Sequence, residues 1–106
     1  MKEIPNLSYV RDLAAGDGVF EQKFIRIIKE EFPEEARKYK QHISLDEPRA
    51  AAEVVHKLKH KFNILSMTDA YGFAVKYEEQ LQLGDMEMDE KFKSILQKIT
   101  LYLKTI

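Results

Sequence analysis

The chain contains no cysteine, and only four glycines and three prolines interrupt its 106 residues. The absence of cysteine excludes disulfide bonds and thiolate metal sites. It also suits a reducing compartment, so we expect a cytoplasmic protein. Because glycine and proline are scarce, and because no alternating strand pattern persists for more than a few residues, we expect the chain to be helical.

The sequence also lacks a surplus of charge of one sign and a long apolar run. Seventeen Lys and Arg stand against eighteen Asp and Glu, a formal net charge of −1. Nonspecific nucleic-acid binding draws on a strong basic surplus, so we expect no nucleic-acid partner. No apolar run approaches the length of a membrane span, and the start Met1-Lys2-Glu3-Ile4-Pro5 lacks the apolar core of a secretory signal. We therefore expect no membrane association.

The composition that remains is typical of one folded domain. Hydrophobic residues make up 44% of the chain and charged residues 33%, a balance found in soluble globular proteins rather than disordered ones. A chain of 106 residues can bury a single core but is too small for two. We expect a single domain over residues 1–106, and a monomer.

Apolar residues at helical spacing predict a short first helix over about residues 6–15 and a long second helix that Asp17 can cap. Pro33 falls inside the second helix. It should kink or divide that helix, because proline removes a hydrogen bond and clashes with the preceding turn. The expected buried residues are Leu7, Val10 and Leu13 in the first helix and Phe20, Phe24, Ile27, Ile28, Phe32, Ala36, Tyr39 and Ile43 in the second.

Three further helices follow from the same pattern. Pro48 fits the first turn of the third, Ser66 or Thr68 can cap the fourth, and Asp85 or Asp89 starts the fifth. Their expected inward residues are Ala51, Val55, Leu58, Phe62 and Leu65, then Ala70, Ala74, Tyr77 and Leu81, and finally Phe92, Ile95, Ile99, Tyr102 and Ile106. The sequence therefore predicts an all-α fold, an antiparallel up-and-down four-helix bundle with a short extra N-terminal helix.

Two histidines lie opposite the apolar stripe of the third helix. At about 100° per residue, His56 is roughly 140° and His60 roughly 180° from the centre of that stripe. Both should face water or a partner, and an exposed imidazole that is partly neutral near neutral pH is available as a nucleophile. Ala52 is small enough to leave the ring approachable, Lys59 reaches the same region, and Asn63 lies further along the same face.

Lys59 suits phosphate chemistry, because a lysine three residues after a phosphorylated imidazole can pair with its anionic oxygens. A simpler interpretation makes Lys57, Lys59 and Lys61 a solvated basic face that keeps the helix soluble. The sequence alone leaves both interpretations open.

The histidines also permit other roles. His56 and His60 have the i, i+4 spacing that can hold zinc on a helix, with Glu53 as a third ligand. No His-Glu-x-x-His motif is present, and we expect no bound metal. His42, near a helix end, should lie at the surface, where it can compensate the helix dipole.

The stretch His56-Lys57-Leu58-Lys59 resembles the His-x-Leu-Lys core of histidine-containing phosphotransfer (HPt) domains, the phosphorelay intermediates of two-component signalling. Residues 16–20 and the long helix containing Phe32-Pro33-Glu34-Glu35 are similar to the family's helix before the active one. The turn Leu65-Ser66-Met67 and the two helices after it also match the family's layout. The resemblance covers nearly the whole chain, and its specific part is the stretch around the histidine.

The resemblance implies that His56 accepts a phosphoryl group from an aspartyl phosphate on a receiver domain and passes it to another receiver, with Lys59 supporting the phosphate. The implied partners are response-regulator receiver domains or a hybrid histidine kinase, and Mg²⁺ would be bound by the receiver rather than by this chain. Because no nucleotide-binding or kinase motif is present, we expect a phosphocarrier rather than an enzyme. The initiating Met1 favours a free-standing protein over a piece of a hybrid kinase.

One position departs from the family's pattern. Many members have a glycine four residues after the histidine, which leaves room for the receiver, and here that residue is His60. A bulky side chain there would crowd His56, so transfer would be slow or restricted to a particular partner. Ala52, His60 and Asn63 are the expected partner-binding residues. The alternative is a helical interaction domain that binds a receiver or kinase without being phosphorylated.

Overall fold

The computed structural model describes residues 3–106, which form five α-helices and no strand. The all-helical class expected from the sequence is confirmed. The expectation of a free-standing protein rests on Met1, which together with Lys2 lies outside the described residues. The helices are α1 (Ser8–Ala14), α2 (Gly18–Ser44), α3 (Pro48–Ile64), α4 (Thr68–Gln82) and α5 (Asp89–Leu103).

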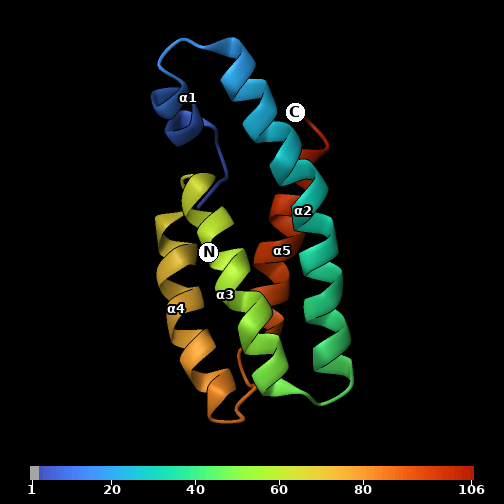
Figure 1. Ribbon diagram of the computed structural model, residues 1–106. Helices are drawn as coiled ribbons and strands as arrows, with labels where there is room; N and C mark the ends of the chain where they lie inside the picture. Colours follow the sequence, from blue (N-terminus) through green and yellow to red (C-terminus); the bar gives the residue numbers. More distant parts are fainter. Residues whose placement is uncertain (1–2) are drawn as a thin grey trace.

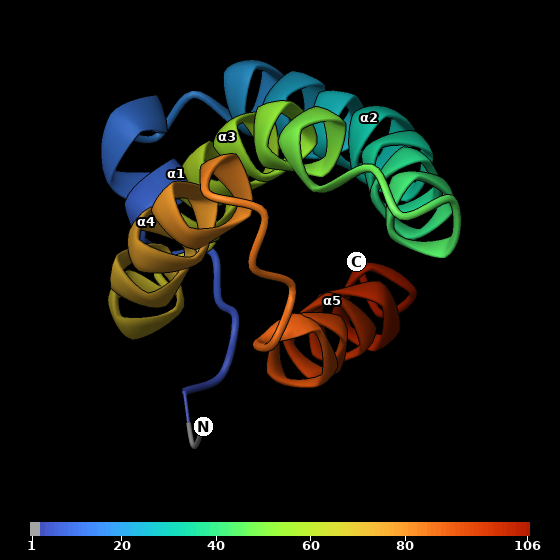
Figure 2. The ribbon, with the colours of Figure 1, turned by 90° about the horizontal axis from the view of Figure 1, so that it is seen from below.

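The four long helices follow one another in alternating directions (Figure 1). Seen along their axes, α2, α3 and α4 form an arc, and α5 lies across from α3 on the inner side of that arc (Figure 2). The short helix α1 lies at the end of the molecule where α2 begins. The molecule is elongated, with principal extents of 44 × 22 × 19 Å. Within the described residues, no helix is both long enough and apolar enough to cross a bilayer.

Helix α3 occupies the middle of the arc and packs closely against both α2 and α4. The inward residues predicted for α3 and α4 are all buried: Ala51, Val55, Leu58, Phe62 and Leu65, and Ala70, Ala74, Tyr77 and Leu81. Alanines on the facing surfaces let the backbones of α3 and α4 approach one another, because a methyl group occupies little space. The orientation of α3 about its own axis is therefore as predicted.

Helix α5 is held mainly by large side chains. The ring of Phe92 lies 4.7 Å from that of Tyr39, 5.6 Å from that of Phe62 and 5.3 Å from that of Tyr77, measured between ring centroids. Phe92 thereby touches α2, α3 and α4 at once. The predicted stripe of α5 needs a correction at its end, because Leu96 and Leu103 are buried while Tyr102 and Ile106 are only partly covered.

The predicted stripe of α2 is wrong near the start of the helix. Phe20 and Ile27 are exposed, and Ile25 is buried instead. The first turns of α2 extend past the ends of α3 and α4 and have mainly α1 beside them, so the core covers fewer of their side chains (Figure 1). Leu13 of α1 is likewise exposed. Pro33 does not divide α2, which runs unbroken from Gly18 to Ser44.

The first turn of α2 is capped as predicted. One carboxylate oxygen of Asp17 accepts hydrogen bonds from the backbone N–H groups of Val19, at 3.0 Å, and Phe20, at 3.1 Å. Helix α5 begins at Asp89, one of its two predicted starts, while the Asp85 carboxylate accepts from the backbone of Glu87 in the preceding turn.

The first turn of α4 is capped from the far end of the sequence. Neither Ser66 nor Thr68 caps it. Instead, the Glu3 carboxylate accepts hydrogen bonds from the backbone N–H groups of Asp69 and Ala70, both at 2.9 Å. A carboxylate at this position also interacts favourably with the positive end of the helix dipole. Rules based on neighbouring residues could not find this cap, because the acceptor precedes its helix by more than sixty residues.

The segment that carries Glu3 enters between α4 and α5 (Figure 2). Pro5 and Leu7 are buried. The Lys98 ammonium donates to the Glu3 backbone carbonyl at 2.8 Å, which joins this segment to α5. Residues 3–7 are therefore part of the folded structure.

Candidate functional site

His56 lies at the middle of α3, and its side chain is 55% exposed. The neighbouring Val55 and Leu58 are fully buried, which directs the histidine away from the core because the three side chains point in different directions around the helix. The exposure expected from the helical periodicity is observed.

One nitrogen of the imidazole faces a carboxylate on the neighbouring helix. The Nδ1 atom of His56 lies 3.1 Å from Oε2 and 3.3 Å from Oε1 of Glu78 on α4. Because an ionised carboxylate can only accept hydrogen bonds, this contact favours the ring form that carries its proton on Nδ1. In the neutral ring, the unshared electron pair then belongs to Nε2.

Lys59 approaches the same carboxylate. Its Nζ lies 2.9 Å from Oε1 of Glu78, and its side chain is only 13% exposed. Glu78, itself 15% exposed, therefore contacts both His56 and Lys59. Lys59 stands beside the histidine as predicted, but it is paired with a carboxylate rather than free in solvent.

The interpretation of three lysines as one solvated face is wrong. Lys61 is buried, and its Nζ lies 3.0 Å from a carboxylate oxygen of Glu31 and 3.0 Å from one of Glu35, both on α2. Lys57 is the exposed member of the three. The lysines of α3 thus point in three directions, toward α4, toward α2 and toward solvent.

His60 stands edge-on to His56. The ring centroids are 5.2 Å apart and the ring planes meet at 87°. His60 and Asn63 are both exposed, in agreement with their expected place on the open face of α3. The space next to the His56 ring, which a glycine would leave empty, is therefore partly filled by imidazole.

Ala52 is not where the sequence placed it. It is 2% exposed and belongs to the core, so it cannot contribute to an open docking face in this conformation. The reason is that α3 has a helix on each side, which widens its buried arc beyond a single stripe. Val54 is buried on the same helix for the same reason.

The third ligand of the alternative zinc interpretation is not in place. Among residues 3–106, no group of three or more His, Asp and Glu side chains lies close enough together to hold a metal ion. Glu53 therefore does not join His56 and His60. His42 lies in the last turn of α2, and its Nδ1 is 2.9 Å from a carboxylate oxygen of Glu47, across the turn to α3.

Glu78 is the residue that sequence reasoning missed. It follows Tyr77, which was correctly placed in the core, so a position at the edge of α4 could have been anticipated. Its partner could not, because 22 residues separate Glu78 from His56 and the contact depends on how α3 and α4 are rotated against each other.

A second polar cluster is formed by Tyr39 of α2, Tyr77 of α4 and Asp89 of α5. The Tyr39 hydroxyl donates to Oδ1 of Asp89 at 2.6 Å and lies 2.7 Å from the Tyr77 hydroxyl. Burial, reinforced by the hydrogen bond to Asp89, raises the pKa of Tyr39 well above its usual range. Burial likewise raises the pKa of Tyr77 to about 12. These groups join α2, α4 and α5 and are separate from the exposed histidine.

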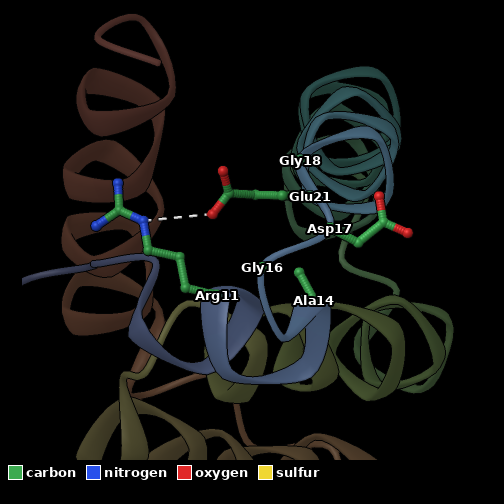
Figure 3. A pocket seen from close by; sticks show the side chains of 6 residues that line it. All are labelled: Arg11, Ala14, Gly16, Asp17, Gly18 and Glu21. Atoms are coloured by element: carbon green, nitrogen blue, oxygen red, sulfur yellow. Dashed lines mark ion pairs between the residues drawn. The ribbon is translucent and has the colours of Figure 1, made fainter.

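A pocket of about 180 Å³ lies where α1 meets α2 (Figure 3). Arg11 and Glu21 point toward one another across it, with a nitrogen–oxygen distance of 3.3 Å. Asp17 at its edge caps α2. The charged groups of this pocket thus serve contacts within the chain.

In comparisons with known proteins, no family model, curated protein or solved structure matches this chain. The most distinctive site in residues 3–106 is an exposed imidazole whose Nδ1 faces a carboxylate that also pairs with a lysine. Such an arrangement presents Nε2 as a nucleophile or a metal ligand.

Proposed function

We propose that this chain is a phosphotransfer module of the HPt type, in which α2 to α5 form an antiparallel four-helix bundle and α1 is the short extra helix. His56 carries the phosphoryl group. The observation that carries this proposal is the contact of His56 Nδ1 with Glu78 at 3.1 Å on a side chain that is 55% exposed. The His-x-Leu-Lys resemblance supplies the class of reaction.

In the proposed reaction, Nε2 of His56 attacks the phosphorus of an aspartyl phosphate on a receiver domain. The new N–P bond forms as the bond from phosphorus to the aspartate oxygen breaks, and the aspartate leaves as a carboxylate. The proton on Nδ1 stays where it is, and Glu78 stabilises the positive charge that the ring gains. The reverse reaction with a second receiver passes the group on.

Lys59 supports the phosphorylated state. In the present structure its ammonium pairs with Glu78, 2.9 Å away, so its charge is already held within reach of the ring. A lysine has a flexible stem, so its ammonium can turn toward the phosphoryl oxygens when they arrive. The receiver would bring Mg²⁺, since phosphoryl transfer depends chiefly on positioning and charge stabilisation.

As a phosphocarrier, the chain would have no nucleotide site of its own and would act as a cytoplasmic monomer. Its partners would be response-regulator receiver domains or a hybrid histidine kinase. His60 and Asn63 lie on the exposed side of α3 and would meet the receiver. Ala52 is left out of this surface because it is buried.

The test uses two phosphoryl donors. A panel of receiver domains, each phosphorylated with acetyl phosphate and Mg²⁺, tests transfer, and phosphoramidate tests the histidine without any receiver. We expect acid-labile, base-stable phosphate on the wild-type chain from at least one receiver and from phosphoramidate. His56→Gln should abolish it, and the matched variant His42→Gln should retain it.

The free energy of unfolding of His56→Gln should lie within about 0.5 kcal/mol of the wild-type value, because the substitution alters an exposed position. This measurement separates loss of the acceptor from loss of the fold. Phosphate that persists in folded His56→Gln, or a wild-type chain that neither donor modifies, would contradict the proposal.

The second candidate is a helical interaction domain that binds a receiver or kinase without being phosphorylated. The observation that favours it is the His60 ring, 5.2 Å from that of His56, where a receiver's active site would need room. Under this candidate a receiver binds wild type and His56→Gln equally and no phosphate is transferred to either. Binding by calorimetry and transfer by radiolabel, measured on the same samples, distinguish the two candidates.

A further inference from the structure

His56 and His60 form a pair of neighbouring imidazoles on the open face of α3. Both side chains are exposed, they are one helical turn apart, and their ring centroids lie 5.2 Å from each other. Two histidines at i and i+4 on a helix project side by side and can donate nitrogen ligands to a single metal ion. The edge-on arrangement of the rings requires one to rotate, and solvent around His60 leaves room for that rotation.

The contact between His56 and Glu78 is of the kind that metal-binding histidines make. Histidines that bind metals commonly donate their other ring N–H to a carboxylate, which fixes the ring and makes the coordinating nitrogen more basic. Glu78 lies 3.1 Å from Nδ1 and can play this part. The nitrogen left available for a metal is then Nε2.

The charges around the pair do not prevent a cation from binding. Lys59 is paired with Glu78, and Lys61 is turned away from the pair toward Glu31 and Glu35 on α2. The exposed Lys57 is next to His56 in sequence, but its side chain projects from α3 in a different direction. The positive charge of Lys59 is therefore compensated by the Glu78 carboxylate.

We propose that His56 and His60 bind a divalent transition metal ion such as Zn²⁺, which occupies Nε2 of His56 and a ring nitrogen of His60. Imidazole is a favourable ligand for zinc, copper and nickel ions. Residues 3–106 contain no group of three or more His, Asp and Glu side chains placed to hold a metal ion together, so water or an added ligand fills the remaining positions.

The metal would block phosphorylation of His56. A neutral imidazole has one basic electron pair, and an Nε2 atom that donates it to a metal cannot attack phosphorus. Metal and phosphoryl group would therefore exclude one another, and His60 would make the acceptor sensitive to metal. This second step rests on the proposed function, whereas metal binding itself does not.

Binding is tested by calorimetric titration of Zn²⁺ into the chain prepared without an oligohistidine tag. We expect one saturable site in wild type and loss of that site in both His60→Ala and His56→Ala. His42→Ala, which removes a histidine paired with Glu47, is the matched control and should bind as wild type does. If His60→Ala bound Zn²⁺ as wild type does, or if wild type showed no saturable binding, the proposed metal site would be wrong.

Glu78→Gln tests whether the site includes the carboxylate behind His56. The loss of such an outer partner typically weakens metal affinity by about 10–100-fold, and we expect a decrease of this size. Circular dichroism and thermal unfolding of each variant establish that the fold is kept. Unchanged affinity in folded Glu78→Gln would contradict the part that we assign to Glu78.

Mutual exclusion is tested by treating the chain with phosphoramidate in the presence and absence of saturating Zn²⁺. Wild type should be protected from phosphorylation, whereas His60→Ala should be modified equally under both conditions. Equal modification of zinc-saturated wild type would overturn the exclusion. A chain that binds Zn²⁺ but is phosphorylated by neither phosphoramidate nor a receiver would retain the metal site and lose the proposed function.

Discussion

Glu78 supports the proposed chemistry in two ways, because one carboxylate contacts both His56 and Lys59. In Glu78→Gln the amide no longer provides a charge for the ring or for the lysine. A hydrogen bond to a charged group contributes about 1.5–3 kcal/mol, so transfer to His56 should slow by about tenfold to a hundredfold. Single-turnover transfer from a phosphorylated receiver measures this rate. The neighbouring variant Glu79→Gln is the control, and equal rates in the two variants would argue against Glu78.

The role of Lys59 can be tested in the same way, because Lys57 on the same helix is exposed and can serve as its control. Lys59→Ala should destabilise the phosphorylated chain by about 1.5–3 kcal/mol through loss of a charge-assisted contact, and Lys57→Ala should have little effect. The equilibrium of phosphate between receiver and chain measures this difference. Identical equilibria in both variants would mean that Lys59 does not support the phosphate and only pairs with Glu78.

The candidate site was predictable from the sequence where it depends on one helix and not where it depends on two. The exposure of His56 and the nearness of Lys59 follow from the angular spacing along α3. The contact with Glu78 and the burial of Ala52 follow from helices placed on either side of α3, which no single-helix pattern contains.

The side chain of Phe92 joins α5 to the three other long helices. Phe92 is fully buried and touches aromatic rings from α2, α3 and α4. Phe92→Ala should lower the free energy of unfolding by about 3–5 kcal/mol, because it removes these contacts and leaves a cavity. Leu101→Ala, at an exposed position of the same helix, should change it by no more than about 0.5 kcal/mol. Urea unfolding measures both, and similar losses would mean that α5 does not pack through Phe92.

The helices themselves were largely predictable, because each carries its own apolar stripe. All nine predicted inward residues of α3 and α4 are buried. The errors lie where a helix leaves the others, as at Phe20 and Ile27, or where a distant segment supplies a contact, as Glu3 does for α4. Both depend on the arrangement of the whole chain rather than on the sequence of one element.

At the scale of the whole molecule, the hydrogen bonds of Tyr39, Tyr77 and Asp89 couple three helices and predict a response to pH. The raised pKa values of both tyrosines mean that the folded chain keeps their hydroxyl protons at a pH where unfolded tyrosines lose them. Ordinary tyrosines ionise near pH 10. The contribution of this network should be fully present below about pH 10 and be lost as the pH rises toward and beyond 12.

Urea unfolding at a series of pH values from 8 to beyond 10 measures this effect. Tyr39→Phe should be less stable than wild type by about 1–3 kcal/mol at pH 8, since it removes the hydrogen bonds of the Tyr39 hydroxyl to the Tyr77 hydroxyl and to Oδ1 of Asp89. The difference between the two should shrink at alkaline pH. Tyr9→Phe, at an exposed position, is the control. A difference that stays constant with pH would contradict the role of the tyrosine protons.

The central claim is that His56 accepts phosphate through Nε2 while Glu78 holds Nδ1. The most direct measurement is long-range ¹H–¹⁵N NMR of the chain after transfer from a phosphorylated receiver, which identifies both the histidine and the nitrogen that carry phosphorus. We predict a single phosphohistidine, at Nε2 of His56, with the Nδ1 proton still present. Phosphate on Nδ1 of His56, or on His60 or His42, would contradict the account.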